Sequence, residues 1–184
     1  MNNSNSYYSY LYSLTNKEIE KKYKLLGEGI SRKVYDLKNG LVLKLAKGQE
    51  GYYQNSVEYY VFSKANHKYL KYLCPILCFT PKLIIMKKAR PLTKTVKDEY
   101  IDIKKIRSEK SALYDLKTLT RDFMLFYEDI ISTSSWGELD HKNVLIDYGC
   151  TSEHGDLYYN WLFSFYYPFN IGASPSPPSP TPQR

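Results

Sequence analysis

This sequence has no long hydrophobic run and only three cysteines. It contains no stretch of about 18 apolar residues, so we expect no membrane-spanning helix. The N-terminus has no apolar run behind a basic segment, so we expect no signal peptide. Cys74, Cys78 and Cys150 have no second pair or nearby histidine to complete a zinc site. We therefore expect core thiols in a reducing, cytoplasmic compartment.

The charge balance is basic, but the sequence has no long basic run. Lysine and arginine outnumber the acidic residues by 26 to 19, which gives a net charge of +7. A positive balance favours an anionic partner without choosing between nucleic acid, phosphates and acidic proteins. Because the lysines are scattered, we expect a solvated basic surface rather than a dedicated nucleic-acid face.

The two ends differ in composition from the body of the chain. Residues 1–20 are of low complexity, rich in Asn, Ser and Tyr, and we expect a mobile segment unless its tyrosines dock on the body. Residues 172–184 are rich in Pro and Ser, which predicts a disordered, extended polyproline-like tail. Hydrophobic residues make up 43% of the chain and charged residues 24%, as in a soluble globular domain.

The first half of the body predicts strands around one helix. Apolar residues alternate with turn signals over 23–45, and Asn39-Gly40 between two β-rich runs predicts a hairpin. Helical spacing of apolar side chains predicts a helix over 52–65. The short apolar runs 73–79 and 82–86 are typical of strands.

The second half of the body is predominantly helical. A helical pattern over 94–128 predicts a helix that ends near Glu128, with an apolar face formed by Leu113, Leu116, Leu119, Phe123 and Phe126. A second hairpin is predicted over 136–147, with a polar turn at 140–143, and a helix over 158–169 that covers the core. The order of elements predicts an α+β fold with a strand-rich beginning.

Three short patterns in the first half carry chemistry. Gly27 and Gly29 form a G-x-G motif, which either makes a plain tight turn or lets backbone N–H groups approach a polyphosphate. Lys44 interrupts an apolar strand, and Glu58 on the following helix can reach back to it. Such a pair would hold the ammonium group toward nucleotide phosphates.

In this order and spacing, the residues resemble the glycine-rich loop, strand lysine and helix glutamate of eukaryotic-like protein kinases: Gly27, Gly29, Val34, Lys44 and Glu58. Arg32 stands where the family has the third loop glycine. The resemblance implies that 83–89 forms the fifth strand and the hinge. Its backbone would bind adenine, with Met86 or Ile85 in the gatekeeper region.

The resemblance extends to Asp147-Tyr148-Gly149, which is similar to the D-F-G segment with Tyr in place of Phe. It implies that Asp147 holds Mg²⁺. Two registers are open for the catalytic loop. In one, Glu138 is the base and Asn143 the metal ligand, but this leaves too few residues before Asp147 for the expected hairpin. In the other, which we favour, Asp129 is the base and Ser134 or Ser135 replaces the metal-binding asparagine.

The resemblance covers residues 23–150 and implies a two-lobed, protein-kinase-like fold. The β-rich N-lobe would span residues 21–88 and a strongly reduced helical C-lobe residues 89–171. The sequence after Gly149 lacks an A-P-E segment and the helices that bind peptide substrates in full kinases. Compact, divergent kinases of this plan are found in viruses and phages, which would place the protein in the cytoplasm, including a host's, or in a virion.

The implied function is ATP-dependent phosphotransfer to Ser or Thr hydroxyls of a protein substrate, with ATP and Mg²⁺ as cofactors. Lys44 and Glu58 would orient the phosphates, and Asp129 would accept the hydroxyl proton. A catalytically weak pseudokinase that binds a nucleotide or a partner is the alternative, favoured by the missing asparagine. Phosphotransfer to a small molecule is a third reading.

Overall fold

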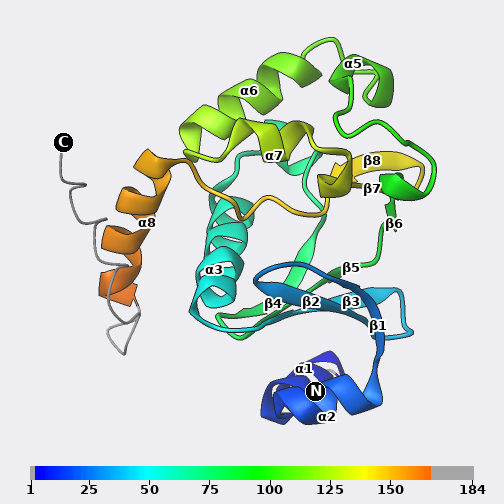
Figure 1. The fold of residues 1–184 in the computed structure, drawn as a ribbon, viewed down its shortest axis with the longest axis vertical. Helices are drawn as coiled ribbons and strands as arrows, with labels where there is room; N and C mark the ends of the chain where they lie inside the picture. Colours follow the sequence, from blue (N-terminus) through cyan, green and yellow to red (C-terminus); the bar gives the residue numbers. More distant parts are fainter. Residues whose placement is uncertain (1–2, 167–184) are drawn as a thin grey trace, which may run out of the picture.

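The fold was obtained as a computed structural model that describes residues 3–166 (Figure 1). The predicted tail, 172–184, lies outside these residues. The first half contains α1 (Asn3–Ser13), α2 (Asn16–Lys22), β1 (Lys24–Glu28), β2 (Arg32–Asp36), β3 (Leu41–Ala46), α3 (Gln49–Lys64), α4 (His67–Leu70), β4 (Ile76–Thr80) and β5 (Leu83–Lys87). The second half contains β6 (Arg90–Pro91), η1 (Leu92–Lys94), α5 (Ile103–Ile106), α6 (Ala112–Asp122), α7 (Tyr127–Ile131), η2 (Thr133–Ser135), β7 (Trp136–Leu139), β8 (Lys142–Leu145) and α8 (Glu153–Tyr166).

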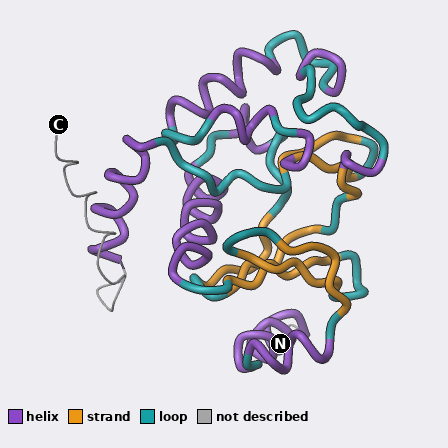
Figure 2. The backbone as a smooth tube through the Cα atoms, viewed as in Figure 1, coloured by secondary structure: helices purple, strands orange, loops and turns teal. Residues whose placement is uncertain are grey.

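A five-stranded antiparallel sheet in the order β1-β2-β3-β5-β4 forms the first half, and α3 connects β3 to β4. The predicted Asn39-Gly40 turn joins β2 to β3, and Gly40 has a φ of 77°, the left-handed conformation that glycine adopts most readily. The predicted second hairpin is also present, as β7 and β8. The described chain is α+β, as predicted, with an antiparallel sheet and several helices (Figure 2), although two helices precede the strands at its beginning.

The two faces of the sheet pack against different helices. Along β3, Leu43 and Leu45 join a core cluster with residues of α1 and α2, whereas Val42 belongs to the larger cluster that includes α3. Because successive side chains of a strand point to opposite faces, Lys44 lies on the same face as Val42. Figure 1 shows α1 and α2 on one side of the sheet and α3 on the other. Lys44 therefore projects toward α3.

The N-terminal segment is ordered in the described residues, which is the alternative that the sequence left open: Tyr7, Tyr8 and Tyr12 dock against the apolar cluster on one face of the sheet. The chain from Asn3 forms α1 and α2, and α2 continues to Lys22, beyond the predicted boundary at residue 20. Thr15 and Glu18 form a reciprocal capping box at the start of α2. Leu11, Leu14 and Ile19 are buried against the sheet. These few apolar residues are spaced to cover one sheet face, a role hidden by the Asn- and Tyr-rich composition.

The prediction of a single helix that ends near Glu128 is wrong. Helix α6 ends at Asp122, and α7 begins only at Tyr127. Between them, Met124 has a φ of 49°, and Leu125 forms a β-bridge with Thr151. This long-range pairing competes with helix continuation, and it turns Phe126 outward, so that its side chain is exposed. Tertiary contacts have overridden a helical pattern.

Helix α8 covers the helical half of the core, as predicted, although its last predicted residues, 167–169, lie outside the described part. Tyr159 and Phe163 are buried, with ring centroids 5.6 Å from Tyr60 and 6.0 Å from Tyr53, respectively. The opposite face of α8 exposes Leu157, Trp161 and Phe165. Within residues 3–166, no helix is long and apolar enough to cross a membrane.

The two phenylalanines of α8 provide a matched test of this packing. Phe163 is 3% exposed and Phe165 is 66% exposed. We expect Phe163→Ala to lower the free energy of unfolding by about 3–5 kcal/mol because it leaves a cavity against α3. Phe165→Ala should change it by less than about 0.5 kcal/mol. Urea denaturation measures both, and equal losses would contradict the observed orientation of α8.

Candidate functional site

A buried ion pair lies between the central strand of the sheet and α3. The ammonium Nζ of Lys44 lies 2.7 Å from Oε1 of Glu58, and both side chains are almost completely buried. Lys44 is held by the pairing of β3 with both β2 and β5. The sequence pattern predicted that these two side chains meet, and the structure brings them together.

The segment after β8 is attached to the same glutamate. It passes between α3 and the α6–α7 region on its way to α8 (Figure 1). The backbone N–H of Tyr148 donates to Glu58 Oε1 at 3.1 Å, and the buried Tyr148 hydroxyl donates to the Cys74 carbonyl at 3.2 Å. A Cβ at Gly149 would lie 2.6 Å from the carbonyl oxygen of Gln54. Only glycine permits this close approach of the segment to α3.

Arg32, at the start of β2, is the second buried cation of the site. Its guanidinium lies between α3 and the Tyr148 segment: Nη2 is 2.5 Å from Asp147 Oδ1, and Nη1 is 3.4 Å from Asn55 Oδ1. Nη1 is also 3.2 Å from Glu58 Oε2. That oxygen is buried and accepts no well-aligned hydrogen bond from any described residue, so Arg32 compensates it through charge alone.

Together these side chains form what we call the charge cluster: Arg32, Lys44, Glu58 and Asp147. Lys44 Nζ is also 3.7 Å from Asp147 Oδ1, so each cation faces both carboxylates. Glu58 is 0% exposed, whereas the side chain of Asp147 is 50% exposed. Asp147 is therefore the member through which a ligand in solution can reach the cluster.

Mutual neutralisation explains the electrostatics of the cluster. Desolvation alone would lower the pKa of Arg32, but the charges of Asp147 and Glu58 outweigh it and raise the pKa. Desolvation would likewise raise the pKa of Asp147, but Arg32 and Lys44 hold it well below its usual value of 3.8. Both groups are thus charged at neutral pH.

The two registers for the catalytic loop place different residues near Asp147. The backbone N–H of Phe126 donates to the Cys150 carbonyl at 3.0 Å, which brings the start of α7 beside the residue after Gly149. Burial, then a hydrogen bond to the Asp129 carboxylate, raises the pKa of the Cys150 thiol to about 12. The Asp129 carboxylate therefore lies near the Cys150 thiol, in the residue that follows Gly149.

Glu138 and Asn143 have structural contacts in the β7–β8 hairpin. They are cross-strand partners, and Glu138 lies 2.5 Å from Nη2 of Arg90. The Asn143 amide donates to the Ile106 carbonyl at 2.9 Å, and its own carbonyl accepts from Arg107 Nη1. Both side chains thus tie the hairpin to its neighbours, which leaves the alternative register without support from these contacts.

The residues present do not fit a tightly held Mg²⁺ ion. Magnesium prefers about six oxygen ligands in octahedral geometry. Asp147 already pairs with Arg32, and the Ser134 hydroxyl is engaged with that of Ser132 at 2.8 Å. No group of three or more His, Cys, Asp or Glu side chains suited to a metal ion occurs within the described part of the chain.

Of the predicted nucleotide-contact residues, the two glycines lie in an open part of the structure, whereas Val34 and Met86 are partly or fully buried. A Cβ at Gly27 would meet no described atom within 4 Å, and at Gly29 only the Arg32 carbonyl at 3.9 Å, so the outer side of this loop is open. Val34 is partly buried next to the core. Met86 is 1% exposed inside the core. Beyond it, the N–H groups of Lys87 and Lys88 donate to the carbonyls of Pro75 and Gly40.

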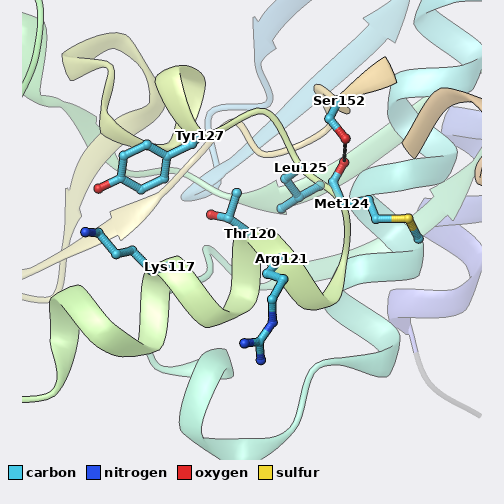
Figure 3. Close-up of a pocket in the computed structure, with 7 residues that line it drawn as sticks. All are labelled: Lys117, Thr120, Arg121, Met124, Leu125, Tyr127 and Ser152. Atoms are coloured by element: carbon cyan, nitrogen blue, oxygen red, sulfur yellow. Dashed lines mark hydrogen bonds between the residues drawn. The ribbon is translucent and has the colours of Figure 1, made fainter. Parts of the chain in front are cut away.

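A pocket of about 530 Å³ lies on the helical half of the molecule, and no member of the charge cluster lines it. Figure 3 shows its lining, in which Lys117, Thr120 and Arg121 come from α6 and Tyr127 from α7. Ser152 donates to the Met124 carbonyl at 3.1 Å at one end. No residue of the sequence-based site prediction lines this pocket.

Comparison with known families gives no identification. Neither a family model nor a curated protein matches the chain significantly. The site must therefore be interpreted from its own residues. Arg32 is the member of the charge cluster whose role sequence reasoning missed. The sequence does show that Arg32 stands where the resemblance would place the third loop glycine. It does not show that the arginine side chain points into the protein.

The ionic state of Asp147 gives a testable pH dependence. Its pKa is lower in the folded protein than its usual 3.8, so its charge stabilises the fold above that pH, and this contribution is lost as the pH falls through the folded-state pKa. We expect the unmodified protein to be more stable than Asp147→Asn at about pH 7, with a difference that shrinks below about pH 4.

Urea denaturation at several pH values measures this difference. Asp140→Asn is the control, because the Asp140 side chain is 82% exposed on a surface turn. It should give no such pH-dependent difference. An Asp147→Asn difference that stayed constant down to about pH 3 would contradict the ionic pairing with Arg32.

Proposed function

We propose that the chain is a compact protein-kinase-like domain whose charge cluster binds the phosphates of a nucleoside triphosphate. The observation that carries the proposal is Lys44, fixed by Glu58 and directed toward Asp147 within ion-pair distance. A lysine held in this way by a helix glutamate is how protein kinases orient nucleotide phosphates. The arrangement suits a nucleotide-binding pseudokinase, a domain that binds a nucleotide without transferring its phosphate.

The order of elements supports the kinase-like assignment. An antiparallel sheet with α3 and the short α4 between its third and fourth strands is followed by helices, then by a hairpin that leads into Asp-Tyr-Gly. The bridge between Leu125 and Thr151 adds a long-range link that brings the region before Asp129 beside this segment. This order of sheet, helices and hairpin is compatible with the proposed resemblance, although Asp129 lies within α7 and not in a loop after a long helix.

The glycine loop supports an approach of phosphate groups. Among the described residues, no packing contact requires glycine at positions 27 or 29. Glycine there leaves space for a phosphate beside the backbone. This support is steric, because the Gly29 N–H donates to the Arg32 carbonyl at 2.9 Å and Gly27 pairs with Val34 in the sheet. Adenine recognition by the hinge has less support, because the N–H groups of Lys87 and Lys88 are already engaged. The proposal is therefore confined to the phosphates.

Ligand-induced stabilisation tests the proposed binding. ATP at about 100 times its dissociation constant should add about 2.7 kcal/mol to the stability of the unmodified protein. Lys44→Met should abolish this gain because it removes the buried ammonium. Lys33→Met is the matched control, since Lys33 lies on the neighbouring strand and pairs with Glu20. Thermal unfolding with and without ATP measures the gain, and its absence from the unmodified protein would refute the proposal.

Phosphotransfer to a protein hydroxyl is the second candidate function. It is favoured by the position of Asp129 beside the Asp147–Gly149 segment, through its contact with Cys150. There, Asp129 would accept the proton of the attacking hydroxyl, as a positioned carboxylate does in general base catalysis. This candidate requires the metal to arrive with the nucleotide, because the residues at Asp147 do not fit a resident ion.

A pair of neighbouring substitutions separates the two functions. If the domain transfers phosphate, Asp129→Asn should reduce turnover by about 10²-fold or more and leave the ATP-induced stabilisation intact. Glu128→Gln, at an exposed adjacent carboxylate, should retain turnover. Transfer of label from γ-labelled ATP to a generic acceptor protein measures this. Turnover that survives Asp129→Asn would rule out this carboxylate as the base.

A further inference from the structure

The position of the Arg32 side chain raises the question of what it does in the site. A loop arginine would be expected to extend into solvent, since a guanidinium is costly to bury without partners. Arg32 is instead 6% exposed, and it faces three acceptors, on Asn55, Glu58 and Asp147. It links the sheet to α3 and to the segment after β8.

The charges around Asp147 balance without a metal ion. Glu58 and Asp147 contribute two negative charges, which Lys44 and Arg32 match with two positive charges. If Arg32 were absent, Lys44 alone would face both carboxylates. The remaining negative charge would attract a divalent cation, because oppositely charged groups interact strongly where water is partly excluded. The charge of Arg32 removes that attraction, and its guanidinium donates a hydrogen bond to Oδ1 of Asp147.

We infer that the Arg32 guanidinium takes the place of a divalent cation at Asp147, so that nucleotide phosphates bind at the charge cluster without a metal ion. The inference rests on the proposed function, because it specifies how the proposed site meets its ligand. It also agrees with the poor fit of Mg²⁺ to Asp147 and Ser134.

A guanidinium is chemically suited to this exchange. Its planar fork donates two parallel hydrogen bonds to phosphate or carboxylate oxygens and stays charged at all physiological pH values. The side chain of Asp147 is half exposed, so a phosphate can arrive from that side and replace Asp147 as an acceptor for Nη2 of Arg32. Lys44 provides the second cation within reach of the same phosphate.

Direct measurement of ATP binding in excess EDTA and in excess Mg²⁺ tests the inference. Isothermal titration calorimetry of the full chain should give dissociation constants that agree within about threefold in the two buffers. Arg32→Gly should weaken binding in EDTA by about tenfold or more, because it removes charge-assisted hydrogen bonds to phosphate. It should also introduce a dependence on Mg²⁺. Lys33→Gly, the adjacent lysine on β2, should behave like the unmodified protein.

The outcomes separate the inference from the function on which it rests. Binding by the unmodified protein that needs Mg²⁺ would overturn the inference and leave the proposed function intact. Tighter ATP binding by Arg32→Gly in EDTA would also overturn it, since Arg32 would then close the site. No ATP binding in either buffer would overturn both. Arg32→Lys guards against misfolding of the glycine variant, because it keeps one charge and should retain metal independence with several-fold weaker binding.

Manganese provides a readout that needs no nucleotide. Electron paramagnetic resonance of Mn²⁺ should detect no binding by the unmodified protein that depends on Asp147. Arg32→Gly should create a Mn²⁺ site, and the further change Asp147→Asn should remove it. A Mn²⁺ site in the unmodified protein that disappears in Asp147→Asn would show that Arg32 does not exclude the metal, and would overturn the inference.

Discussion

The buried contact between Lys44 and Glu58 is the interaction on which the arrangement of this molecule depends. Transfer of two charges from water into the interior is unfavourable unless each finds compensating partners. Glu58 finds three: the Lys44 ammonium, the Tyr148 N–H and the charge of Arg32. These partners come from β3, from the start of β2 and from the segment after β8. A single glutamate therefore fixes the relative positions of α3, the sheet and the Asp-Tyr-Gly segment, and its loss would leave two cations without their shared counter-charge.

Apolar residues surround the contact between Lys44 and Glu58, but the contact is linked to the solvent through Asp147. One sheet face is covered by α1 and α2 through leucine and isoleucine side chains, and the other carries both Lys44 and the larger apolar cluster. That cluster continues from Ile84 on the sheet to Leu119 and Tyr159 on the helices. The charges thus lie at the edge of a continuous apolar core, with Asp147 open to solvent. The cluster therefore combines a low local dielectric around its two cations with one member, Asp147, that is accessible from solvent.

Asp147 has two opposing relations to the proposed ligand. It makes the Arg32 guanidinium rigid before any phosphate arrives, which reduces the cost of ordering that side chain on binding. It also competes with the phosphate for the same Nη2 atom. In protein kinases a metal ion bridges an aspartate carboxylate and the phosphates of the nucleotide. At the proposed site, the Asp147 carboxylate and the phosphate would instead share the Arg32 guanidinium.

Local signals in the sequence determined much of this protein. The Asn39-Gly40 turn, the apolar run of β3 and the apolar spacing of α3 predicted the sheet and helix that bring Lys44 to Glu58, because each depends on nearby residues. The tertiary structure alone decided the rest. It ended α6 early to pair Leu125 with Thr151, and it ordered the N-terminal helices through Leu11 and Ile19. It also turned Arg32 inward, because only the folded chain places three acceptors around its guanidinium. The sequence shows an arginine in a loop, and the fold makes it a buried counter-ion.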